Sequence, residues 1–156
     1  MTSSGDQFVQ QLRTETKTAQ ALLACLKDES AALQDISADK LEVVIGRKIE
    51  LLKEMTQCAI ERTELLAATG FSMEPSAVKA FIQQHSPQAT PLWEALLATT
   101  AQLEAQNQIN GGMIQLGQQR TQMALDIITR PGETTKTYGK QGYTEPDPTS
   151  YTSVKA

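Results

Sequence analysis

The sequence predicts an all-α protein: an elongated antiparallel left-handed bundle of three long helices plus one short helix, followed by a disordered C-terminal tail. Apolar residues recur at three- and four-residue steps over three long stretches, which is the period of one helix face. Only 4% of the 156 residues are aromatic, a composition that favours elongated helices over a sheet core. The stretch Pro91–Arg130 contains no second proline, and as a helix it would be about 60 Å long. Only other long helices can cover such an apolar stripe.

The first helix is expected from Asp6 to about Gln34. Glu15 and Glu29 interrupt its heptad seam, and we interpret them as marking frayed or water-facing turns. A pair of catalytic carboxylates is the weaker interpretation, because nothing else converges on them. In the connector that follows, Ser37 suits the N-cap of the next helix. The apolar heptad positions are Phe8, Leu12, Ala19, Leu22, Leu26 and Leu33.

The second helix is expected from about Ala38 to Thr69, with Gly70 as the residue that ends it. Its apolar stripe is wider than the seam of a two-stranded coiled coil. A wide stripe faces two neighbours, so it predicts a bundle. Lys48 and Arg62 fall on this stripe, where their long stems can cover apolar surface and release the charge to water.

Between the second and third long helices, the periodic pattern breaks from Phe71 to Thr90. A short helix, Ala77–Gln84, is predicted to cap one end of the bundle. Phe81 and Trp93 are the expected anchors where this helix docks. His85 is the one histidine of the chain, and we interpret it as a solvated loop residue beside a proline turn.

The last long helix is expected over Pro91–Arg130, with Thr90 as its cap. Gly111 and Gly112 lie in the middle of its pattern, where each costs roughly 1 kcal/mol relative to alanine. Two interpretations stay open: a local bend or close helix approach inside the bundle, or a groove where a partner helix lies close to exposed backbone. Around and after the glycines the apolar stripe turns to a new set of residues: Ile109, Met113, Leu116, Met123 and Ile127.

The sequence divides into a helical bundle domain, residues 1–130, and a flexible C-terminal tail, residues 131–156. The tail has no Leu, Ile, Met or Phe, so it cannot bury enough apolar area to offset its ordering entropy. All three tyrosines of the chain lie in it: Tyr138, Tyr143 and Tyr151. Tyrosine supplies large contact area with few rotatable bonds, so the tail is either a docking segment or a floppy terminus.

Composition excludes several classes of function. A net charge of −4 with mixed signs gives no attraction for nucleic acid, and no apolar run is long enough to span a bilayer. The first residues do not form a secretory signal, so we expect a cytoplasmic protein with Cys25 and Cys58 as free thiols. One histidine and two distant cysteines exclude the usual zinc spacings. We expect no cofactor and no enzymatic activity, because no Gly-rich phosphate loop or nucleophile–base set is present.

Three stretches carry a family resemblance. Arg47–Leu52 (RKIELL) is followed by Arg62, a leucine pair and Gly70. Asn107-x-x-Asn110-Gly111 is followed by the apolar pair Met113-Ile114, and Thr137–Gly142 reads TYGKQG. In this order and spacing they resemble the FlgN family of flagellar type III export chaperones. The resemblance implies that the chain holds the terminal helical segments of hook-associated proteins and delivers them to the flagellar export gate.

A helix laid into an apolar groove would suit such a client. The predicted partner-binding residues combine the family motif, the end of the last helix and the tail. They are Asn110, Gly111, Met113, Ile114, Met123, Ile127, Ile128, Tyr138 and Tyr143. The main alternative is a structural coiled-coil adaptor that forms a permanent complex. A regulatory helical domain acting on transcription is a more distant alternative.

Overall fold

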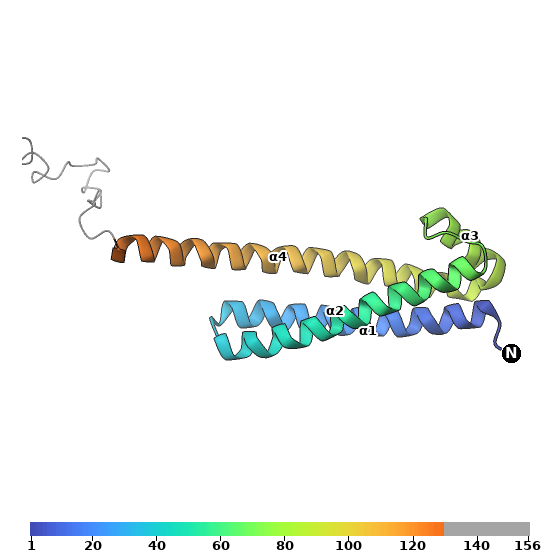
Figure 1. The fold of residues 1–156 in the computed structure, drawn as a ribbon, viewed down its shortest axis with the longest axis horizontal. Helices are drawn as coiled ribbons and strands as arrows, with labels where there is room; N and C mark the ends of the chain where they lie inside the picture. Colours follow the sequence, from blue (N-terminus) through green and yellow to red (C-terminus); the bar gives the residue numbers. More distant parts are fainter. Residues whose placement is uncertain (130–156) are drawn as a thin grey trace, which may run out of the picture. The chain divides into compact units, whose positions relative to one another are not determined.

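The computed structural model describes residues 1–129 and confirms the all-α class. Within these residues three long helices and one short helix follow in the predicted order (Figure 1). The chain divides into two compact units, Met1–Gln115 and Leu116–Ala156, and the second is described over Leu116–Thr129. The elements are α1 (Ser4–Gln34), α2 (Ala38–Ala68), α3 (Pro75–His85), the 3-10 turn η1 (Pro87–Ala89) and α4 (Thr90–Thr129). The predicted tail residues Tyr138 and Tyr143 lie outside the described residues.

Helix α1 begins two residues before the predicted start, because Ser3 is its N-cap. The Ser3 hydroxyl accepts a hydrogen bond from the Asp6 backbone N–H at 3.1 Å. The Asp6 carboxylate in turn accepts from the Ser3 backbone N–H at 3.3 Å. This reciprocal pair is a capping box, which satisfies two donors that the first helical turn leaves without partners.

Helices α1 and α2 form an antiparallel hairpin and lie side by side (Figure 1). The predicted N-cap of α2 is confirmed, since the Ser37 hydroxyl accepts from the Lys40 N–H at 3.4 Å. The predicted stop is also confirmed. Gly70 has φ +81°, a left-handed conformation that glycine adopts without steric cost, and α2 ends at Ala68 just before it.

The apolar core lies where α3 covers the first turns of α1. The short helix was predicted to cap one end of the bundle, and it does. Phe81 from α3 and Phe8 from α1 are fully buried, with ring centroids 4.9 Å apart in an edge-to-face arrangement. Trp93 is half-buried against the same core. The other buried members of this core are Leu12, Ala19, Leu66, Val78, Ile82, Ala89 and Leu96.

Two details of this region differ from the prediction. Helix α3 begins at Pro75 rather than Ala77, because proline is well suited to the first helical position, and it ends at His85 rather than Gln84. His85 is exposed, but it is the last residue of α3 rather than a loop residue, and its ring stacks on Phe81 with centroids 4.9 Å apart.

Helix α4 is one uninterrupted helix through Gly111 and Gly112. A Cβ atom added at either glycine would meet nothing within 4 Å. The interpretation of close helix approach inside the bundle is therefore wrong among residues 1–129. The two glycines are exposed instead, which leaves backbone open on the surface of α4.

Among the described glycines, Gly5 is the one whose surroundings leave no room for a side chain. A Cβ atom on Gly5 would lie 2.2 Å from the backbone oxygen of His85 at the end of α3. No rotamer change can relieve a clash with a backbone atom, so the close approach of α1 to α3 requires glycine here.

We predict opposite effects for alanine at these glycines. Gly5→Ala should lower the free energy of unfolding by about 1–3 kcal/mol, the usual cost of overpacking. Gly112→Ala, which has open space around it, should raise the free energy of unfolding by up to about 1 kcal/mol through helix propensity. Urea denaturation of the two variants measures both values. Equal stability of Gly5→Ala and the parent protein would contradict the packing described here.

Candidate functional site

A buried ion pair joins α1 to α2 toward the turn that connects these two helices. The Lys48 ammonium donates to both Glu29 carboxylate oxygens, at 3.2 and 3.1 Å. Only 3% of Glu29 is exposed to solvent. The prediction that Glu29 marks a frayed or water-facing turn is therefore wrong. Lys48 does not release its charge to water either, since its ammonium is bound to Glu29. Without this cation, burial of the Glu29 carboxylate would cost several kcal/mol.

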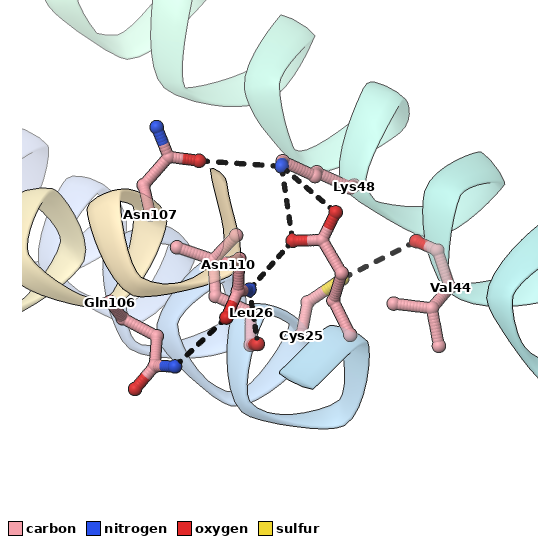
Figure 2. A network of polar contacts seen from close by, with 8 residues as sticks. Cys25, Leu26, Val44, Lys48, Gln106, Asn107 and Asn110 are labelled. Atoms are coloured by element: carbon pink, nitrogen blue, oxygen red, sulfur yellow. Dashed lines mark hydrogen bonds and ion pairs between the residues drawn. The ribbon is translucent and has the colours of Figure 1, made fainter. Parts of the chain in front are cut away.

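Helix α4 reaches the same carboxylate through Asn110 (Figure 2). The Asn110 amide nitrogen donates to a Glu29 carboxylate oxygen at 2.8 Å and to the Leu26 backbone oxygen at 2.8 Å. Its amide oxygen accepts from Gln106 at 3.0 Å. One turn earlier, the Asn107 side-chain oxygen accepts from the Lys48 ammonium at 3.4 Å. These bonds satisfy both ends of a buried amide, which Figure 2 shows pointing into the network.

The network, which we define as Glu29, Lys48, Asn107 and Asn110, brings together two of the sequence motifs. Lys48 belongs to the RKIELL stretch, and the two asparagines form Asn107-x-x-Asn110-Gly111. Asn110 is 1% exposed, so its side chain lies inside the unit rather than on a surface. The motif therefore positions α4 against α1 and α2.

A second buried pair lies nearer the core. Arg62 of α2 pairs with Glu15 of α1, which is also buried, so the predicted water-facing role of Glu15 is wrong. The Arg62 guanidinium carbon lies 5.5 Å from the centre of the Trp93 ring of α4. That distance allows a cation–π interaction. Arg62 thus connects α2 to both other long helices.

A signal for both ion pairs was present in the sequence. Glu15 and Glu29 are fourteen residues apart in α1, and Lys48 and Arg62 are fourteen residues apart in α2. In an antiparallel hairpin, two such equal spacings place one acid opposite one base twice. Sequence reasoning considered the acids and the bases separately and missed this.

Beyond Asn110, the predicted partner-binding residues that the structure describes lie at or near the surface. Gly111 is exposed, and Met113 is half-buried with its sulfur 3.7 Å from the Ser30 hydroxyl. In the second unit every described side chain from Leu116 to Thr129 is exposed. Two of the exposed apolar side chains of this unit, Leu116 and Leu125, were not among the predicted partner-binding residues. The predicted members are exposed at 64% for Met123, 66% for Ile127 and 72% for Ile128, and Ile114 of the first unit is also exposed.

A further apolar face on α2 was not anticipated. The wide stripe of this helix was predicted to be covered by two neighbours, yet one flank of it stays exposed. A shallow hollow on this flank is lined by Ile49, Leu52, Lys53, Thr56 and Gln57. The exposed apolar side chains are Ile45, Ile49, Leu52 and Ile60.

The two cysteines are buried free thiols, as predicted. The Cys25 sulfur lies 3.5 Å from the Val44 backbone oxygen. Burial raises the pKa of the Cys25 and Cys58 thiols above their ordinary value, which favours the neutral form. At Cys25 the charges of Arg47 and Lys48 lower the pKa while those of Asp28 and Glu29 raise it, and the loss of solvent remains the largest effect.

Residues 1–129 contain no group of three or more His, Cys, Asp or Glu side chains placed to hold a metal ion. Over the same residues, no helix is both long and apolar enough to cross a membrane.

Comparison with known proteins identified one family. A family model described as FlgN protein matches residues 1–146, a range that contains all three of the sequence stretches noted above. No curated protein and no solved structure matches the chain.

We predict that Lys48→Met lowers the free energy of unfolding by about 3 kcal/mol, because the Glu29 carboxylate would stay buried without its cation. Lys53→Met is the matched control on the same helix. Lys53 pairs with Glu50 at 3.1 Å, but both side chains are largely exposed. Its loss should cost less than about 0.5 kcal/mol.

Urea denaturation distinguishes the two variants. The double variant Glu29→Gln, Lys48→Met should recover part of the lost stability, because it removes the unpaired charge. If Lys48→Met proves as stable as Lys53→Met, the network does not hold the helices together as described.

Proposed function

The chain belongs to the FlgN family of flagellar export chaperones, and we propose that its clients are the terminal helical segments of hook-associated proteins. Such segments present apolar helix faces that associate with one another unless a partner covers them. On this proposal the chain covers these faces in the cytoplasm and passes its clients to the flagellar export gate. It acts by binding and catalyses no reaction.

The observation that carries the proposal is the exposed apolar surface at the end of α4. Exposed apolar side chains recur along Leu116–Thr129, and none of the described residues covers them. Surfaces of this kind are typical of protein interaction sites. A long amphipathic helix can receive a client helix along its apolar face.

We assign the client-binding role to Met123, Ile127 and Ile128, with Ile114, Met113 and the open backbone at Gly111 as further contacts. Asn110 acts indirectly, because its amide holds α4 in place from inside the first unit. We further propose that Tyr138 and Tyr143 contribute to docking on the client or on the export gate. A chain ending at Arg130 tests this tail role, which is excluded if client binding and export are both unchanged.

A permanent coiled-coil adaptor is the alternative function. An adaptor would copurify with one partner through a large apolar interface. An exchangeable client instead requires moderate affinity, because an export chaperone must release what it carries. Affinity purification followed by a chase with excess unlabelled client separates the two, since a client should exchange and an adaptor's partner should remain bound.

We predict that Met123→Glu combined with Ile127→Glu weakens binding of hook-associated proteins by about tenfold or more, because charge replaces apolar contact area. Isothermal titration calorimetry with purified hook-associated protein measures the affinity. The parent fold should be unaffected, since both side chains are exposed in the free protein.

Val43→Glu is the matched control. Val43 is an apolar residue of α2 with an exposure of 74%, similar to that of Met123 and Ile127. Its replacement should leave client affinity unchanged. If the double variant binds as tightly as this control, the end of α4 is not the client site.

A further inference from the structure

Four exposed residues of the second unit form one heptad stripe. Leu116, Arg120, Met123 and Ile127 follow each other at steps of four, three and four. These steps place them at alternating d and a positions, the core positions of a coiled coil. We call this set the C-terminal stripe. Its period specifies the shape of an occupant, which must be a helix with the same repeat.

Arg120 is the one charged member of the stripe. The described ion pairs of residues 1–129 do not include it. Asp126 is the one acidic residue of Leu116–Thr129. It lies off the stripe and accepts a hydrogen bond from Gln122 at 3.0 Å. An occupant therefore meets a guanidinium in the middle of an apolar seam, with no carboxylate already beside it among the described residues.

A second copy of the chain fits this stripe poorly. A parallel pair in register would place the two Arg120 side chains in the same core layer. An antiparallel pair that covers the whole stripe would place them in adjacent layers, about 4.5 Å apart along the axis. Like charges so close in an apolar seam repel strongly, so the stripe disfavours self-association.

The chain's own tail does not match the stripe either. Residues 131–156 contain no Leu, Ile, Met or Phe. They cannot supply the large apolar side chains that would alternate with Met123 and Ile127 in a helical core. The occupant must therefore come from another protein.

We propose that the C-terminal stripe binds an amphipathic client helix that carries Asp or Glu at the core position facing Arg120. The carboxylate would accept two hydrogen bonds from the guanidinium, while the arginine stem covers apolar surface beside it. Arg120 thereby selects acidic-core helices over apolar or basic ones. This inference rests on the proposed function, since it specifies which terminal helices of hook-associated proteins the stripe accepts.

Three synthetic helices test the selectivity. Each is about three heptads long, with Leu and Ile at the a and d positions, and they differ at one central core residue: Glu, Gln or Lys. Fluorescence anisotropy with the full chain should show the tightest binding for the Glu peptide. The Lys peptide should bind about tenfold more weakly than the Glu peptide, or weaker still. Arg120→Glu should reverse this order. Arg13→Glu, at an exposed position of α1, changes the net charge equally and should leave the order unchanged.

Each other outcome has a defined meaning. If Arg120→Glu keeps the parent order of peptides while hook-associated segments still bind, the charge selection is wrong and the proposed function stands. If the parent chain binds none of those segments, the proposed function itself has failed. Sedimentation that shows a dimer lost in Met123→Glu would assign the stripe to a second copy and overturn the inference. A chain ending at Arg130 that binds every peptide far more tightly would assign it to the tail, with the same result.

Discussion

The buried carboxylate of Glu29 is the constraint on which the first unit depends. A charge removed from water is tolerated only where cations and hydrogen-bond donors replace the lost solvent. Here α2 supplies the ammonium of Lys48 and α4 supplies the amide of Asn110. Sliding any of these helices by one residue would leave buried polar groups without partners. A single carboxylate therefore fixes the register of three helices, as buried polar residues do in coiled coils.

This constraint divides α4 into parts with different tasks. Its first part buries Leu96, Thr99 and Asn110 within the first unit. Isolated helices of about 14 residues are marginal in water, so Leu116–Thr129 gains from continuing a helix that is already formed. It can then keep its apolar side chains exposed rather than use them for its own folding. On the proposed function, this exposed surface at the end of the helix is where the client binds.

Sequence periodicity predicted the order and number of the helices, and turn chemistry at Ser37 and Gly70 placed the ends of α2 within a residue or two. The interior polar contacts were not predicted, because they depend on which side of α4 faces α1. Asn110 illustrates this, since a helical asparagine beside two glycines suits a partner groove as well as a buried network. Glu15 and Glu29 were misassigned because each was judged within its own helix, without the base that faces it.

The exposed flank of α2 shows a second limit. Ile45 and Leu52 have the same apolar character as buried residues, and the sequence pattern assigned both to the apolar stripe of this helix, yet both are exposed, as are Ile49 and Ile60. Periodicity reveals which residues share a face, but it does not reveal whether another helix covers that face. Within residues 1–129, α2 and the end of α4 both leave apolar side chains exposed.

Hydrogen–deuterium exchange of the full chain, with and without a hook-associated protein, tests the central claim most directly. If the client binds at the end of α4 and the polar network is purely structural, backbone amides in Leu116–Thr129 should exchange more slowly when the client is added. Those of α1 should change little. Unchanged exchange at the end of α4, or slowing confined to residues 45–60 of α2, would contradict it.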